Sequence, residues 1–205
     1  MIFLNRCLAC DNNDGFLCDP CRSRLQFLST PAHLPSLKKC FFETAHSSVA
    51  YQGLSLELIH RYKYHHQFYL IPLFAHFLES TALDWNRYDS FAYVPSHWWQ
   101  RLRRGFNPSH LLAHELAKKK SKPICHALKK TKRTQPQAKL SKEARLENVK
   151  ETFFIRPNQK SEVADKTFLL IDDVLTTGST VNECARALKK SGAKQVDVLT
   201  LARAL

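Results

Sequence analysis

Two adjacent carboxylates followed by a hydroxyl-rich loop are the residues best suited to chemistry in this chain. Asp172 and Asp173 come directly after the apolar run Phe168–Ile171. Backbone N–H groups and hydroxyls that converge at the start of a helix bind phosphate, and the helix dipole adds favourable potential. Carboxylates would repel a phosphate, so we expect them to accept hydrogen bonds from a diol, which predicts a phosphorylated ribose as ligand. The expected phosphate loop is Thr176, Thr177, Gly178, Ser179 and Thr180.

The same residues have a simpler interpretation as a buried strand, a helix-capping Asp and a Thr-rich N-cap. The stretch is neither a P-loop nor a dinucleotide fingerprint, because it lacks both glycine patterns. The unbroken order of strand, carboxylates, loop and helix favours the phosphoribosyl site. The stretch resembles the 5-phosphoribosyl 1-pyrophosphate (PRPP) motif of type I phosphoribosyltransferases. That resemblance implies that Asp172 and Asp173 hold the ribose hydroxyls and that the loop holds the 5′-phosphate.

Four cysteines near the N-terminus form a second group, arranged as two C-x-x-C pairs. Four thiolates at this spacing favour a tetrahedral zinc ion, and because no ligand position stays open we expect a structural site. No secretory signal is apparent, which disfavours disulfides, and an iron–sulfur cluster is the alternative. The predicted ligands are Cys7, Cys10, Cys18 and Cys21, while the isolated Cys40, Cys125 and Cys184 are expected to be small buried residues.

A basic turn predicts a second anion site. The strand expected at Phe91–Val94 is followed by RLRRGFN at 101–107 and by a helix beginning near Pro108. In a phosphoribosyl site the second anion is pyrophosphate, and a guanidinium fork matches phosphate oxygens. We therefore expect Arg103, Arg104 and the backbone at Gly105 to contact it.

The positive charge of the chain is concentrated in one quarter of its length. Of the net charge of +13, residues 97–150 carry fifteen Lys/Arg against three Asp/Glu, a net of +12. Most such blocks are solvated surface, but a local excess is also typical of proteins that bind polyanions. The polar stretch 129–148 predicts a long loop, which could close as a cationic lid over pyrophosphate.

These residues require an α/β fold in which strand ends meet helix starts. Apolar runs predict strands at 48–51, 91–94, 153–155, 168–171 and 196–201, and the run 168–171 is typical of a parallel sheet covered on both faces. The expected division is a four-cysteine element at 1–28, a linker at 29–46 and a phosphoribosyltransferase-like domain at 47–205. No run is long enough for a membrane span, so we expect a cytoplasmic protein.

Taken together, the motifs resemble those of the ComF family. The marks are the double C-x-x-C, Tyr62-Lys63-Tyr64, Arg104-Gly105-Phe106-Asn107 and the Asp172 motif, with a scattered set between them: Thr134, Gln137, Leu140, Arg145 and Asn148. The resemblance implies a zinc knuckle joined to a type I phosphoribosyltransferase-like parallel sheet flanked by helices, and it makes Lys63 a PRPP-site candidate. Two departures are Pro108, where the family often has Gln, and Lys130 and Lys132, where Arg is more frequent.

The resemblance leaves two functions open. The first is a competence factor for natural transformation that binds PRPP with Mg²⁺ and also binds single-stranded DNA, with a DNA-translocating helicase as the family's implied partner. The second is an active transferase with an unidentified acceptor. Trp98, Trp99 and Phe106 offer stacking surfaces, although core packing is the simpler explanation for the tryptophans. The lid and DNA candidates are Lys129, Lys130, Lys132, Arg133, Gln137, Arg145 and Asn148.

Overall fold

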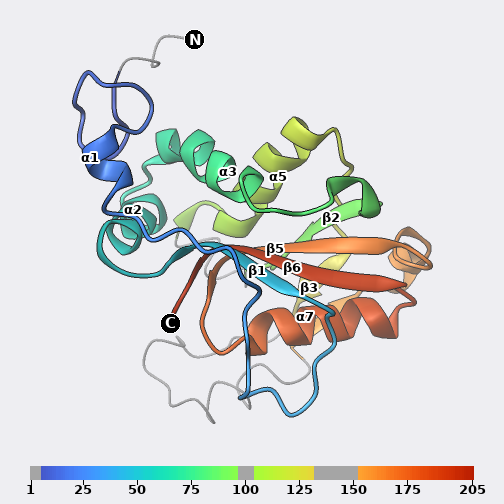
Figure 1. Ribbon diagram of the computed structural model, residues 1–205. Helices are drawn as coiled ribbons and strands as arrows, with labels where there is room; N and C mark the ends of the chain where they lie inside the picture. Colours follow the sequence, from blue (N-terminus) through green and yellow to red (C-terminus); the bar gives the residue numbers. More distant parts are fainter. Residues whose placement is uncertain (1–5, 97–103, 132–151) are drawn as a thin grey trace.

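The computed structural model describes residues 6–96, 104–131 and 152–205, and its centre is a four-stranded parallel sheet (Figure 1). The strand order is β1-β6-β5-β2. The strands are β1 (Ala45–Ala50), β6 (Gln195–Arg203), β5 (Thr167–Leu175) and β2 (Ser90–Tyr93), and every pair in this sheet is parallel. This confirms the predicted α/β class and its parallel sheet.

Helices cover both faces of the sheet, which explains why its central strand is apolar on both sides. On one face lie α2 (Gly53–Tyr64), α3 (Ile71–Glu79) and α5 (Pro108–Lys120), and on the other lies α7 (Ser179–Lys190) (Figure 1). Leu169 and Ile171 pack toward the first group, whereas Phe168 and Leu170 pack toward α7, and all four are fully buried. The shorter helices are α1 (Asp19–Arg22), η1 (Phe68–Leu70), η2 (Trp85–Arg87) and η4 (Pro157–Glu162).

The central strand is longer than its apolar run predicts. β5 continues through Asp172 and Asp173 to Leu175 because β6 runs beside it as far as Arg203. On the other side β2 ends at Tyr93, opposite Ile171. The expectation that the carboxylates follow the strand was therefore wrong: they lie inside β5, at the point where one of its two edges loses its partner.

A second, smaller sheet corrects the expected start of the long basic loop. β3 (Leu128–Lys130) pairs antiparallel with β4 (Phe153–Ile155). Leu128, Phe153 and Ile155 are buried in the core under α7, and this burial holds Lys129 and Lys130 in a strand. Lys132, Arg133, Gln137, Arg145 and Asn148 lie outside the described residues, as do Trp98, Trp99 and Arg103.

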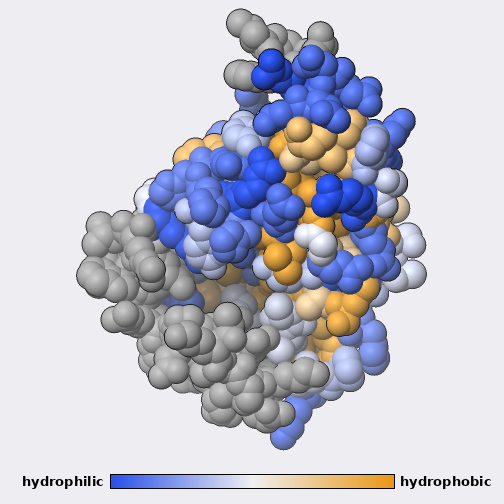
Figure 2. Space-filling view, turned by 90° about the vertical axis from the view of Figure 1, so that its left-hand side faces the viewer, coloured by the Kyte–Doolittle hydropathy of each residue, from blue (hydrophilic) through white to orange (hydrophobic). Residues whose placement is uncertain are grey.

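The cysteine-containing element projects from the body beside α2 (Figures 1 and 2). Leu8 and Leu25 belong to the same core as Leu58 of α2, and Arg61 donates from Nη1 to the carbonyl of Ala9 at 3.0 Å. In the space-filling view, apolar surface lies directly beneath this mostly hydrophilic element (Figure 2).

The start of β1 and the exposure of Cys40 differ from what the sequence predicts. β1 begins at Ala45, inside the segment expected as a linker, and the proposed divisions at residues 28 and 46 stay predictions. Cys125 and Cys184 are buried as expected, whereas Cys40 is exposed, so the prediction for it was wrong. None of the helices in the described residues is long and apolar enough to cross a membrane.

Candidate functional site

The two carboxylates of β5 are held by different elements. Asp172 is 8% exposed, and its Oδ1 accepts hydrogen bonds from Ser109 Oγ at 2.7 Å and from the Asp173 N–H at 2.9 Å. Asp173 Oδ2 lies 2.8 Å from Nζ of Lys63, in the last turn of α2. The site therefore joins β5 to the end of α2 and to the start of α5.

These surroundings set the protonation of the pair. Burial, followed by the charge of Asp173, raises the pKa of Asp172 from 3.8 to about 7. Burial opposes the charged form of Lys63, but the carboxylate of Asp173 outweighs it and raises the pKa of that ammonium. Near neutral pH the site thus contains a lysine ion pair beside a carboxyl group that can gain or lose a proton.

The hydroxyl-rich loop connects these carboxylates to α7. Gly178 is the N-cap of α7 and has φ 76°, which an L-residue adopts at a cost. The hydroxyls of Thr177 and Ser179 are 2.8 Å apart and both residues are buried, while Thr176 and Thr180 are half-buried. The loop thus has the backbone N–H groups and helix dipole of a phosphate site.

A strap formed by residues 34–41 packs against this loop and was not predicted from the sequence. Ser36 Oγ donates to the carbonyl of Thr177 at 3.3 Å. Asn182 of α7 accepts from the Phe41 N–H and donates to the Lys39 carbonyl, both at 2.8 Å. Asn182 is buried on an otherwise apolar helix face, and a polar residue in that position was the one available signal.

The second anion turn lies at the start of α5. Gly105 has φ 76° and is exposed, and Asn107 caps the helix by accepting from the Ser109 N–H at 3.2 Å. Because Ser109 also binds Asp172, the helix start lies beside the carboxylate pair. Arg104 stacks over the ring of Tyr64 at 4.9 Å and donates to its hydroxyl at 3.3 Å.

Lys130 lies on a strand, although the sequence predicted it in the basic loop. It is half-buried on β3, with Nζ 5.4 Å from the ring centre of Phe153. Burial lowers its pKa, against the opposing effects of Cys184 and Asp172. On β3, Lys130 lies opposite Phe153 of β4.

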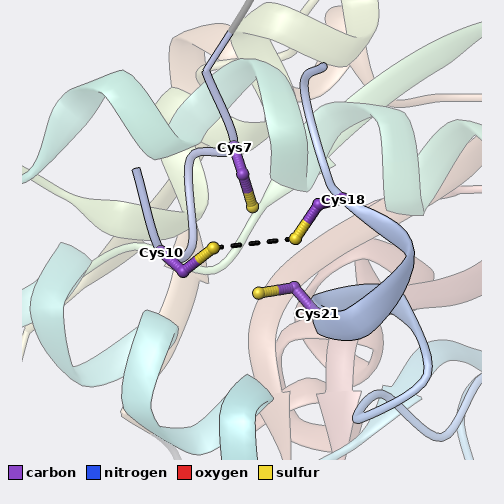
Figure 3. Close-up of side chains that lie close together, drawn as sticks. All are labelled: Cys7, Cys10, Cys18 and Cys21. Atoms are coloured by element: carbon purple, nitrogen blue, oxygen red, sulfur yellow. Dashed lines mark hydrogen bonds between the residues drawn. The ribbon is translucent and has the colours of Figure 1, made fainter. Parts of the chain in front are cut away.

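The four N-terminal cysteines converge from two turns of the chain (Figure 3). Their sulfur atoms all lie within 4.8 Å of one another, and Cys10 and Cys18 Sγ are 3.6 Å apart. A tetrahedral zinc ion with Zn–S bonds of about 2.3 Å separates its sulfurs by roughly 3.8 Å, so the arrangement fits zinc. These four cysteines form no disulfide, and Cys10 is exposed while the other three are buried.

Comparison with known proteins places this site in a family. The phosphoribosyl transferase domain family matches residues 102–205. Competence protein F of Haemophilus influenzae is 33% identical over 72% of this chain and 67% of its own length. Competence protein ComFC of Streptococcus pneumoniae is 26% identical over 94% of this chain and 90% of its own.

DNA utilization protein YhgH of Escherichia coli is 38% identical over 52% of this chain, and the match spans only 47% of that relative. The match to the Haemophilus protein reaches two thirds of the relative's length, and the family model covers about half of this chain, including β5, α7 and β6. The chain therefore belongs to the ComF family and carries its phosphoribosyltransferase domain.

Proposed function

We propose that this protein acts in DNA uptake, as the names of its competence and DNA utilization relatives suggest, and that it binds PRPP with Mg²⁺ at the carboxyl end of β5. One observation carries the PRPP proposal. Asp172 and Asp173 lie where β5 loses its β2 neighbour, between the loop that starts α7 and the turn that starts α5. In open α/β sheets, ligands bind in the crevice outside the carboxyl ends of the strands.

The parts of PRPP match the parts of the site. The 5′-phosphate would bind at Thr176–Thr180, and the ribose diol would donate to Asp172 and Asp173. Pyrophosphate would meet the turn at Arg104 and Gly105, together with Lys130. Bound Mg²⁺ would neutralise pyrophosphate charge, while Lys63 holds Asp173 in place for the diol.

Calorimetry with Mg²⁺ and PRPP tests this proposal. Asp172→Asn and Asp173→Asn keep the side-chain shape and remove the charge, and each should weaken PRPP binding at least about tenfold, since hydrogen bonds to charged groups contribute about 1.5–3 kcal/mol. Asp165→Asn is the matched control, because this exposed residue has φ 60°, which Asn tolerates. Wild-type protein that binds PRPP no better than ribose 5-phosphate would argue against a site for the whole ligand.

DNA handling is the second half of the proposal. The support is the concentration of positive charge in residues 97–150 and the relatives' names. Binding of a labelled single strand should weaken steeply as salt rises, because phosphate contacts release counterions. A flat salt response would contradict it. A cytoplasmic location and a helicase partner are further proposals, and co-purification with a helicase of the uptake machinery would test the latter.

Transfer chemistry is a second candidate function, supported by the match of residues 102–205 to the phosphoribosyl transferase domain family. The bond from the acceptor to C1 of the ribose would form as the C1–oxygen bond breaks, with pyrophosphate taking the electron pair and solvent water taking the acceptor's proton. Acceptor-dependent release of pyrophosphate from PRPP would support this candidate, and release only by water would oppose it.

A further inference from the structure

A cluster of exposed rings borders the carboxylate site, and nothing in PRPP binding requires it. The segment from His60 to Tyr69, HRYKYHHQFY, forms the end of α2 and the turn into η1. Tyr64 is 55%, Tyr69 47% and Phe68 42% exposed, although large rings are normally buried. His60, His65 and His66 are exposed as well. Clustered exposed apolar side chains mark interaction sites.

The rings form two contacting groups. Tyr64 packs against His60 with ring centres 4.6 Å apart. Phe68 packs against Phe106 at 4.8 Å, and His66 contacts both of them. Tyr62 is the exception, since it is fully buried and its hydroxyl donates to the carbonyl of Pro108. That buried ring anchors the segment, so the exposed rings have a fixed support.

Cations accompany these rings, and two carboxylates pair with cations of the segment: Glu57 lies 3.8 Å from Arg61, and Asp173 lies 2.8 Å from Lys63. The guanidinium of Arg104 lies over Tyr64. Arg61 donates to Gln67 Oε1 at 2.6 Å and to the Tyr69 hydroxyl at 2.7 Å, which holds the turn. No Asp or Glu occurs between Glu57 and Glu79. The surface therefore combines stacking faces with positive charge, the chemistry of single-strand binding.

We infer that this ring cluster binds the unstacked bases of a single-stranded nucleic acid, next to the phosphoribosyl site. This inference rests on the proposed DNA-handling function, and it assigns the base contacts to the end of α2 instead of to the basic loop at 129–148. Two ring groups can hold more than one base, whereas a free nucleotide offers only one. A duplex keeps its base faces stacked on each other, so the cluster selects single strands. On α2, Lys63 follows His60 by one turn and precedes Tyr64, and its ammonium contacts Asp173. Bases bound at these rings would therefore lie beside the carboxylates of the ribose site.

Fluorescence anisotropy with a labelled thymidine oligonucleotide tests the inference on the full chain. The double variant Tyr64→Leu/Phe68→Leu removes two rings and keeps apolar bulk, and it should weaken single-strand binding at least about tenfold, since stacking contributes about 1–3 kcal/mol per base. Tyr64→Phe keeps a ring and should bind as wild type does. Phe27→Leu is the matched control, because that ring is 38% exposed and packs against Phe77, outside the segment from His60 to Tyr69.

The possible outcomes distinguish this inference from the proposed DNA-handling function on which it rests. Wild-type protein that binds no single strand would overturn DNA handling itself. Wild-type binding that the double variant preserves would overturn the ring cluster alone. Competition by free thymidine monophosphate at equal affinity would also overturn it, in favour of a small-molecule site. Arg104→Gln should reduce the slope of log affinity against log salt by about 1, whereas the leucine variants should leave the slope unchanged.

Discussion

The ammonium nitrogen of Lys63 lies 2.8 Å from Oδ2 of Asp173, and the two side chains are only 16% and 13% exposed. This contact joins the last turn of α2 to the strand that carries the acidic pair. Because most water is excluded, neither charge is well solvated without the other. The pair is therefore both a structural link and a constraint on the carboxylate that would meet the ribose.

A double-mutant cycle tests this link. Lys63→Met and Asp173→Asn should each lower the free energy of unfolding by about 1–3 kcal/mol, because each leaves a partly buried polar partner unmatched. The double variant should lose at least about 1 kcal/mol less than the sum of the two. Urea denaturation gives these values. As a control, Lys119→Met removes a more exposed partner of Glu79 and should cost under about 1 kcal/mol; additive losses at Lys63 and Asp173 would contradict the link.

The pKa of Asp172 predicts how stability depends on pH. Folding raises this pKa from 3.8 to about 7, so the folded state holds a proton that the unfolded state has released. The contribution of Asp172 to stability is therefore largest at acidic pH and falls as pH rises from about 4 to 7. Asp172→Asn is neutral at every pH and still accepts from Ser109.

The difference in thermal midpoint, variant minus wild type, should be at least about 4 °C larger at pH 8 than at pH 5 for Asp172→Asn. Thermal unfolding followed by circular dichroism across that range measures it. The difference for Asp165→Asn should stay constant, because that residue is exposed. A difference for Asp172→Asn that does not change with pH would contradict the raised pKa.

The two glycines with φ 76° provide a matched pair of substitutions. A Cβ at Gly178 would lie 2.7 Å from Cδ1 of Leu34 in the strap, whereas a Cβ at Gly105 meets nothing within 4 Å. Gly105→Ala should lower the free energy of unfolding by about 1–2 kcal/mol, because only the backbone conformation is unfavourable for alanine there. Gly178→Ala should lower the free energy of unfolding by more than that, because its Cβ also meets Leu34, and it should weaken PRPP binding.

Chemical denaturation and calorimetry together measure those two effects. Adding Leu34→Ala should recover part of the loss at Gly178, because it removes the atom that the new Cβ meets. Equal costs at the two glycines, with no recovery, would mean that the strap does not restrain the loop.

Metal removal tests the cysteine site. Purified protein should contain about one zinc per chain, and a strong chelator or Cys21→Ser should lower the thermal midpoint, because metal binding supplies folding free energy to so short an element. The effect should extend to the body, since Cys21 shares a core with Leu58. Cys40→Ser is the control, because Cys40 is exposed and outside the cluster. Elemental analysis that finds iron would favour the cluster alternative.

Much of this site could be predicted because its residues are local in sequence. The run from Phe168 to Thr180 contains a strand, two acids, a loop and a helix start, and each has a sequence pattern that does not depend on distant residues. The grouping of the four cysteines followed from their spacing in the same way. The four cysteines are grouped as predicted, whereas the two acids lie inside β5 and not after it.

What could not be predicted depends on partners far away in the chain. The length of β5 is set by β6, and the strap at 34–41 is held by Asn182, more than a hundred positions away. Lys130 looked like part of a charged loop because its strand is short and its apolar partner, Phe153, follows a long insertion. Local patterns contain no information about such contacts.

The position of β1 in the sheet also has a consequence for synthesis on the ribosome. β1 pairs only with β6 among the described strands, and the Ser47–Thr200 contact between them spans 153 positions. At 5–20 residues per second, β1 waits roughly 8–30 s for its neighbour. Residues 26–32, which hydrogen-bond to β1 outside the sheet, are made before it, so only the edge of β1 that faces β6 lacks its partner during that interval.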